Sequence, residues 1–124
     1  MPRKTHQKTA IVEAIQASDR PLTSNEVLEA ARADVPSLGI ATVYRNLKVL
    51  VEKELIREVV LPGESTRRYE RADHHHHPHF LCRVCKKVFD IHACPPGLED
   101  FAPPGFHVED HELVIYGRCD GCVA

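Results

Sequence analysis

The chain has no long hydrophobic run. A membrane-spanning helix needs roughly 20 consecutive apolar residues, and no stretch of the 124-residue chain approaches that length. Residues 1–6 also contain no hydrophobic stretch of the kind that a signal peptide requires. These absences exclude a membrane protein and predict a protein of the cytoplasm.

Neither sign of charge is in large excess, because 16 lysines and arginines stand against 18 aspartates and glutamates. The two parts of the chain nevertheless differ. Residues 1–72 hold 12 basic and 10 acidic residues, a net charge of +2, whereas residues 73–124 hold 4 and 8, a net charge of −4. We therefore expect any phosphate-binding surface in the first part and acidic metal ligands in the second.

The marks of an enzyme are also missing, since no nucleophile with a neighbouring base and no open catalytic zinc site can be named. One stretch resembles the sequence signature of the zinc deaminases, because His107 and Glu109 are followed by Cys119 and Cys122. However, no proline precedes Cys119, the gap is short, and these cysteines have partners elsewhere. The sequence predicts a protein that is not an enzyme.

Five cysteines are present, and four form pairs at two-residue spacing, Cys82 with Cys85 and Cys119 with Cys122. In a reducing compartment such pairs are more often metal ligands than disulfides, and an odd total argues the same way. Four thiolates at this spacing predict a tetrahedral structural zinc, with each sulfur about 2.3 Å from the ion. A rubredoxin-like iron site, a redox-active dithiol and coincidence are the rival interpretations. Cys94 is left over.

The first part carries three helical patterns. Apolar residues at helical spacing predict a helix over residues 8–17, and the capping-box spacing of Thr23 and Glu26 begins a second helix that ends near Ala33. A third helix is predicted for residues 40–54, with Val43, Leu47 and Leu50 on its packed face. The opposite face carries small, aromatic and cationic residues, namely Ala41, Tyr44, Arg45 and Lys48.

That opposite face is suited to DNA. A small residue allows close approach to a groove, the Tyr44 hydroxyl can reach phosphate or a base edge, and Arg45 can pair with guanine through two hydrogen bonds. A solvated face without a partner is the other interpretation of this helix alone. The β-rich runs that follow form a hairpin whose return strand carries Arg67 and Arg68. Three helices and a basic hairpin predict a winged helix.

The second part alternates two strand-like runs with proline-rich segments. Strands are predicted over residues 80–91 and 108–116, each with a cysteine pair at one end. The prolines between them leave room for little more than one helical turn, around residues 98–101. We expect a small zinc-stapled sheet that serves in dimerisation.

A run of histidines ends at His79 and is interrupted only by Pro78. An engineered tag would be terminal and unbroken, and a merely solvated polar stretch is the other interpretation. On a strand, His77 and His79 point to the same side, and the carboxylates of Glu70 and Asp90 can complete a site of nitrogen and oxygen donors. Such a mixture suits Zn²⁺, Fe²⁺ or Mn²⁺ at lower affinity than four thiolates, as a sensor requires.

Four stretches, taken in order, resemble the ferric uptake regulator (Fur) family across almost the whole chain. They cover residues 5–8, 39–47, 75–85 and 111–122. The family consists of dimeric winged-helix repressors that bind palindromic operators when loaded with metal, and its branches sense iron, zinc, manganese or peroxide. The resemblance implies an α+β fold, with a winged helix-turn-helix DNA-binding domain in residues 1–72 and a small zinc-stapled α/β dimerisation domain in residues 73–124.

The resemblance also implies roles for single residues. Tyr44 and Arg45 would contact the major groove, and Lys8 would replace an arginine that reaches the minor groove. The full set of expected DNA contacts is Lys8, Ala41, Thr42, Tyr44, Arg45, Lys48, Arg67 and Arg68. The implied structural zinc ligands are Cys82, Cys85, Cys119 and Cys122. The implied regulatory ligands, between the two parts, are Glu70, His77, His79 and Asp90.

Three departures from the family pattern matter. A histidine that many members supply to the regulatory site falls at about Pro21 here, so that ligand is missing or replaced. Matches to an additional metal site exist at His76, Glu99 and His111, but Pro78 replaces another of its ligands. The dimerisation helix is cut short by prolines, and Cys94, in this region, is either an extra soft ligand or an inert thiol.

These expectations combine into one hypothesis. The chain forms a homodimer that binds double-stranded DNA when a regulatory Zn²⁺, Fe²⁺ or Mn²⁺ joins the two parts, with zinc slightly favoured. An iron-based peroxide sensor would use the same ligands. A metal-buffering zinc protein without DNA is the remaining rival, and the face that carries Tyr44 and Arg45 argues against it.

Overall fold

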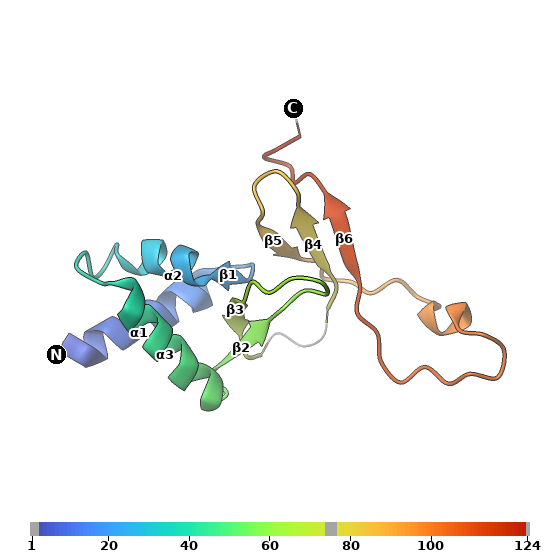
Figure 1. The fold of residues 1–124 in the computed structure, drawn as a ribbon, viewed down its shortest axis with the longest axis horizontal. Coiled ribbons are helices and arrows are strands. Elements are labelled where there is room, and N and C mark those ends of the chain that lie inside the picture. The colour runs from blue at the N-terminus through green and yellow to red at the C-terminus, as the bar shows by residue number, and fades with distance from the viewer. Residues whose placement is uncertain (1–2, 74–76, 124) are drawn as a thin grey trace. The chain divides into compact units, whose positions relative to one another are not determined.

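A computed structural model describes residues 3–73 and 77–123. The chain divides into two compact units, Met1–His75 and His76–Ala124, and Figure 1 labels their elements. Within the described ranges, no helix is both long enough and apolar enough to cross a membrane.

The first unit combines helices with a small sheet. Its elements in chain order are α1 (Arg3–Ala17), β1 (Leu22–Thr23), α2 (Ser24–Ala31), α3 (Ile40–Glu52), β2 (Ile56–Val59) and β3 (Arg68–Arg71). The strands pair antiparallel in the order β1-β3-β2. The predicted helices and hairpin are present, although α1 begins five residues earlier than the predicted start at Lys8. The two-residue strand β1 was not predicted, because it exists only through its pairing with β3.

The helices of this unit bury one continuous apolar core. The predicted inner face of α3 is confirmed, since Val43, Leu47 and Leu50 are each at most 1% exposed. They pack with buried side chains of α1, such as Ile11 and Ile15. Full burial of each of these side chains stabilises the fold by about 1.5–3 kcal/mol. This packing fixes which face of α3 remains at the surface.

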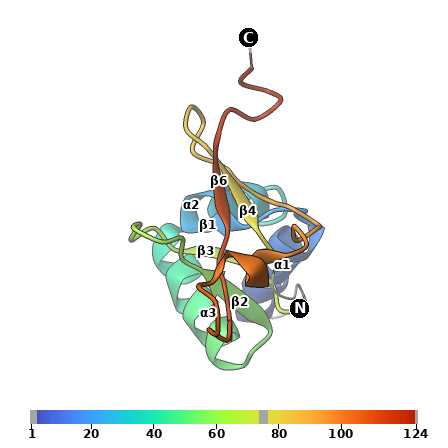
Figure 2. The ribbon, with the colours of Figure 1, turned by 90° about the vertical axis from the view of Figure 1, so that its right-hand side faces the viewer.

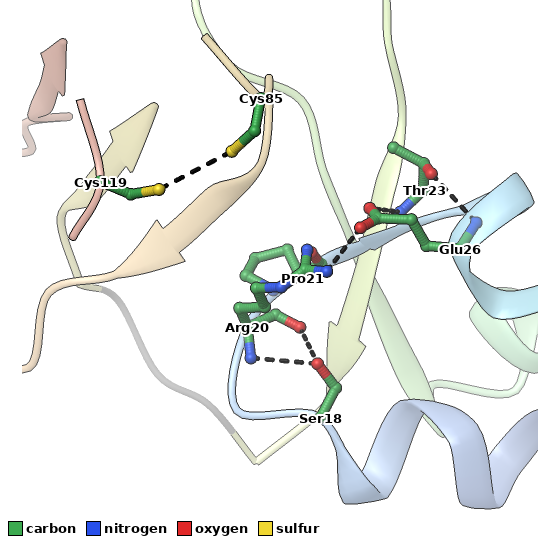
Figure 3. Close-up of polar contacts among 7 residues, drawn as sticks. All are labelled: Ser18, Arg20, Pro21, Thr23, Glu26, Cys85 and Cys119. Atoms are coloured by element: carbon green, nitrogen blue, oxygen red, sulfur yellow. Dashed lines mark hydrogen bonds and ion pairs between the residues drawn. The ribbon is translucent and has the colours of Figure 1, made fainter. Parts of the chain in front are cut away.

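The predicted capping box at the start of α2 is confirmed. Thr23 Oγ1 accepts a hydrogen bond from the Glu26 backbone N–H at 3.2 Å, and Glu26 Oε1 accepts one from the Thr23 N–H at 3.0 Å. Figure 3 shows both bonds, together with the ion pair that Arg20 makes with Glu26 at 2.5 Å. The N-terminal turn of α2 is therefore held by three polar contacts.

Replacing Thr23 with alanine should lower the free energy of unfolding by about 1 kcal/mol, because one backbone donor of α2 loses its acceptor. Urea denaturation of the metal-loaded protein measures this loss. The Thr23→Ser variant keeps the hydroxyl and should remain within a few tenths of a kcal/mol of the parent. Equal losses in both variants would show that the methyl group, not the cap, is responsible.

The second unit is a three-stranded sheet with a long excursion. Its elements are β4 (His79–Cys82), β5 (Val88–Asp90), the 3₁₀ helix η1 (Leu98–Phe101) and β6 (Val114–Gly117). The order is β5-β4-β6, with β4 antiparallel to β5 and parallel to β6. Figures 1 and 2 show β6 beside β4, after the excursion that carries η1. The short helical turn predicted around residues 98–101 is confirmed.

Two strand predictions in this unit need correction. The predicted strand over residues 80–91 is two strands, because the chain reverses between them at Lys86, whose φ is +66°, and Lys86 donates its backbone N–H to Cys82 at 2.9 Å. The second predicted strand, residues 108–116, begins only at Val114. Alternating apolar residues indicated strand over both stretches, but only the paired segments form it.

The second unit has a small apolar core. Its buried apolar side chains, within the described residues, include Leu81, Cys82 and Val88, whereas Phe101 and Phe106 are 84% and 71% exposed. A core of this size supplies little stabilisation by itself, so such units usually depend on a metal, a disulfide or a second subunit.

Candidate metal centres and DNA-facing surface

The parallel pairing of β4 and β6 gathers four thiols at one end of the second sheet. Cys82 ends β4, Cys85 lies in the turn that follows, and Cys119 and Cys122 come just after β6. All five cysteines of the chain are free thiols, and the sulfurs of these four lie within 4.8 Å of one another. The topology therefore brings together the two cysteine pairs that the sequence singles out.

The geometry of this cluster fits a tetrahedral zinc. Two sulfurs that each lie 2.3 Å from one tetrahedral ion are about 3.8 Å apart. The sulfurs of Cys85 and Cys119, one from each pair, are 3.8 Å apart and point toward each other in Figure 3. Four thiolates are also the donor set of structural zinc sites, so the residues present fit the predicted cofactor.

Backbone hydrogen bonds favour the thiolate form of one of these cysteines, which is the form that binds a metal ion. The N–H groups of Cys85 and Cys119 both point at Cys82 Sγ, at 3.4 Å, and these hydrogen bonds lower the pKa of Cys82 to about 6. In contrast, the hydrogen bond with Cys119 and burial raise the pKa of Cys122 to about 12. Several thiolates cannot share so small a volume without a cation, which a bound Zn²⁺ would supply.

A second cluster of donors lies at the other end of the same strands. The register of β4 and β5 places His79 opposite Asp90, and His77 precedes β4. Asp90 Oδ1 lies 2.7 Å from His77 Nε2 and 3.4 Å from His79 Nε2, and the Asp90 side chain is fully buried. The two imidazole rings stand edge to face, with centroids 4.9 Å apart.

The donor chemistry of this cluster differs from that of the thiols. Two imidazoles and a carboxylate suit Zn²⁺, Fe²⁺ or Mn²⁺, and they leave coordination positions open for further ligands. The predicted fourth ligand, Glu70, lies on β3 in the first unit, where it is 2% exposed and its carboxylate is 3.3 Å from Arg57 Nε. Pro21, at the position where many family members carry a histidine, is buried and offers no ligand atom in its side chain.

The predicted additional site is only partly described. His76 lies outside the described residues, and Pro78 is fully buried. Glu99 and His111 line a cavity of about 500 Å³, and Cys94 lines it as well. Across the described ranges, two sets of three or more metal-donor atoms lie within 4.8 Å of one another, and this cavity holds neither.

The face of α3 opposite the core is exposed. Ala41, Tyr44, Arg45 and Lys48 all lie at the surface, and Tyr44 is 55% exposed. Thr42 is partly buried and accepts a hydrogen bond from Arg45 Nη2 at 3.1 Å. Burial of one face thus leaves on the other the small, aromatic and cationic set that suits a DNA groove.

The hairpin differs from the prediction at one residue. Arg67 is exposed, with 68% of its side chain accessible, and Lys8 on α1 is partly buried. Arg68, predicted to contact DNA, is only 3% exposed, and its Nη1 lies 3.8 Å from Glu64 Oε2. Arg68 therefore has almost no accessible surface and cannot present its charge to a phosphate.

A polar cavity of about 330 Å³ adjoins this surface, and sequence reasoning did not predict it. It lies where the start of α2, the exposed face of α3 and the hairpin loop meet. The residues that line it are Thr23, Ser24, Asn25, Tyr44, Ser65, Thr66, Arg67 and Tyr69. Its lining contains hydroxyls, an amide and a guanidinium but no carboxylate, which is the chemistry of a surface for phosphate. The capping box marked the start of α2, but only the fold brings the hairpin beside it.

The model of the ferric uptake regulator family matches residues 2–116. The chain belongs to the ferric uptake regulator family. This confirms the predicted family and, with it, the fold class: a winged helix-turn-helix domain followed by a small zinc-stapled dimerisation domain. Members of the family are transcription regulators, not enzymes, as the sequence predicts for this chain.

Named relatives lie in several branches of the family. The chain is 34% identical to the peroxide operon regulator of Bacillus subtilis, over 97% of this chain and 83% of that protein. It is 33% identical to the peroxide-responsive repressor PerR of Staphylococcus saprophyticus, over 97% and 82%. Among solved structures, the ferric uptake regulator of Francisella tularensis with iron is 26% identical, with a TM-score of 0.67 over 94% of this chain and 90% of that one. The chain is a metal-responsive regulator of this family.

Proposed function

We propose that the chain is a homodimeric, metal-dependent repressor that acts in the cytoplasm and binds palindromic operators upstream of metal uptake or homeostasis genes. The observation that carries this proposal is the presence, in one chain, of a nitrogen and oxygen donor cluster separate from the thiol cluster. Four thiolates would hold zinc permanently. The weaker donors His77, His79 and Asp90 are left to respond to the metal supply.

Contacts to DNA would come from the first unit. Tyr44 and Arg45 would enter the major groove, with Ala41, Thr42 and Lys48 beside them on α3. Arg67 and the hydroxyls of the adjoining polar cavity would bind the phosphate backbone, which fixes the position of the helix but reads no sequence. Lys8 on α1 would reach the minor groove.

The metal response would act through the link between the two units. Glu70 from the first unit would join His77, His79 and Asp90 from the second, as the sequence predicts. When bound, the ion supplies a shared positive charge that holds these four side chains together. Because its donors come from both units, the ion would bind more tightly to the arrangement of the units that can bind DNA than to other arrangements. To convert a population that mostly cannot bind DNA into one that mostly can, the ion must bind the DNA-binding arrangement more tightly by roughly 5 kcal/mol.

A second candidate function is peroxide sensing with iron. The observation that favours it is the identity of 33–34% to two peroxide-responsive regulators over nearly the whole chain. The same nitrogen and oxygen donors would hold Fe²⁺ in that case. Loss of DNA binding after peroxide treatment of the iron-loaded protein, but not of the zinc- or manganese-loaded protein, would select this candidate.

The test of the proposed function is the affinity of the purified dimer for DNA upstream of its own gene, titrated against buffered free zinc, iron and manganese, with a chelator control. Binding that requires one of these metals supports the proposal and identifies the effector. Equal binding in the chelator would show that the histidine cluster is not the switch. Absence of specific binding under every condition would favour a metal-buffering role.

Arg45→Ala should weaken binding to the operator by about 1–3 kcal/mol, or roughly 5- to 150-fold, because a bidentate pair with a base is lost. Fluorescence anisotropy with labelled operator and with a scrambled duplex measures both affinity and specificity. The control Lys87→Ala removes an exposed cation from the second unit and should leave specificity unchanged. If Arg45→Ala binds the two duplexes with unchanged preference, Arg45 does not read a base.

A further inference from the structure

The hairpin of the first unit places a cation directly against the expected metal ligand Glu70. Arg57 on β2 and Glu70 on β3 are partners across the antiparallel strand pair, and Arg57 Nε lies 3.3 Å from Glu70 Oε1. The Glu70 side chain is only 2% accessible, whereas that of Arg57 is 39% accessible. A partly exposed guanidinium thus contacts a carboxylate that is almost fully buried.

The same hairpin carries a second pair of an arginine and a glutamate, and the two pairs differ in burial. Glu58 Oε1 lies 3.7 Å from Arg67 Nε, and these side chains are 34% and 68% accessible. Exposed pairs of this kind contribute little to stability, because water screens both charges. Glu70 is shielded from water, so its negative charge needs a cation beside it. The register of β2 and β3 supplies one in Arg57.

Stability alone gives no reason for a carboxylate at position 70. Burial of an ion pair requires the desolvation of both groups, and apolar side chains of similar volume are often as stable or more stable. The adjoining strand β2 already buries the apolar side chains of Ile56 and Val59, so an apolar residue would suit these surroundings. The proposed role of Glu70 as a ligand to the regulatory metal does give a reason for its charge.

Arg57 and a metal ion would use the same carboxylate. A divalent ion at Glu70 would lie close to the guanidinium, and the two positive charges would repel each other. Arg57 therefore favours the metal-free state, in which it neutralises Glu70. The rival role is to orient the carboxylate for the ion, as the hydrogen-bond partners of metal ligands often do. A neutral donor could do so without this repulsion, so the charge of Arg57 favours competition.

We propose that Arg57 competes with the regulatory metal for Glu70 and thereby raises the metal concentration at which the protein binds DNA. This inference rests on the proposed function, in which Glu70 is a ligand. Arg57 is not among the expected DNA contacts. It would therefore change the metal concentration required for binding, but not the operator affinity of the fully loaded protein.

The experiment measures the affinity of the full-length protein, with zinc in the thiol cluster, for Mn²⁺ and, separately, for further Zn²⁺. A chelator indicator of known affinity competes for each ion. Arg57→Gln keeps a hydrogen-bond donor but removes the charge, and Arg57→Lys keeps the charge. Arg71→Gln is the matched control, because it removes the same charge one residue after Glu70, from an exposed pair with Asp73. Glu70→Gln tests the ligand itself.

We expect Arg57→Gln to bind the ion on the order of 10-fold more tightly than the parent, because a charge beside the ligand is removed. The metal concentration for half-maximal operator binding should fall by the same factor. Arg57→Lys and Arg71→Gln should stay within about 2-fold of the parent. Urea denaturation gives a second readout: Arg57→Gln should unfold at lower urea than the parent, and saturating metal should reduce this difference. Circular dichroism checks that each variant is folded.

The outcomes separate this inference from the proposed function. If Glu70→Gln weakens metal binding but Arg57→Gln leaves it unchanged or weaker, Arg57 does not compete, and the proposed function stands. If Arg71→Gln binds the ion as tightly as Arg57→Gln, the effect is one of net charge and the inference is overturned. If Glu70→Gln binds as the parent does, or the parent binds neither ion outside the thiol cluster, the inference and the proposed metal response are both overturned.

Discussion

Cys82→Ser should abolish tight zinc binding and unfold the second unit. Structural zinc with thiolate ligands contributes an apparent 10–16 kcal/mol to small metal-dependent folds, and the buried apolar core of this unit is too small to replace it. We chose Cys82 because its sulfur accepts hydrogen bonds from two backbone N–H groups, those of Cys85 and Cys119. Its replacement also gives these partly buried donors a neutral hydroxyl in place of a thiolate.

The zinc that survives dialysis against a weak chelator, measured per chain by mass spectrometry, decides this prediction. The parent should retain one tightly held ion and Cys82→Ser none, with loss of the dimer in sedimentation. Cys94→Ser is the matched control, since it also removes one thiol but lies outside the cluster. Full retention of zinc in Cys82→Ser would mean that the four thiols are not the structural site.

His79→Ala should remove the metal dependence of DNA binding and leave the fold and the structural zinc in place. His79 lies opposite Asp90 across the strand pair, and Asp90 Oδ1 lies 3.4 Å from its Nε2. Without this imidazole the site keeps too few strong donors for a transition metal. If about 1% of the metal-free protein is competent to bind DNA, operator affinity should fall about 100-fold, to the level of the parent in chelator.

The measurement is operator binding at saturating effector metal, for the parent and for His79→Ala. His92→Ala is the control, because His92 is an exposed histidine just after β5 and should preserve the full response. An undiminished metal response in His79→Ala would rule out this cluster as the switch. A loss of the tightly held zinc as well would indicate a general folding defect rather than a regulatory one.

The sequence alone was sufficient where the information is local. Two-residue spacing within each cysteine pair specified the thiol ligands, because a tight turn around one ion needs only neighbouring residues. The capping box of Thr23 and Glu26 located the start of α2 for the same reason. Periodicity along α3 assigned one face to the core and left Tyr44 and Arg45 on the other. The family could also be recognised from the order of its short motifs.

The tertiary structure decided what depends on pairing between distant segments. Arg68 lies on β3, which pairs with β1 and β2, and its burial could not be predicted because alternation along one strand does not say which residues are buried. The reversal at Lys86 divided one predicted strand into two. Cys94 and His111 come together only because the excursion between β5 and β6 folds back on itself. Local sequence determined the elements and the donor types, whereas chain topology determined which donors meet.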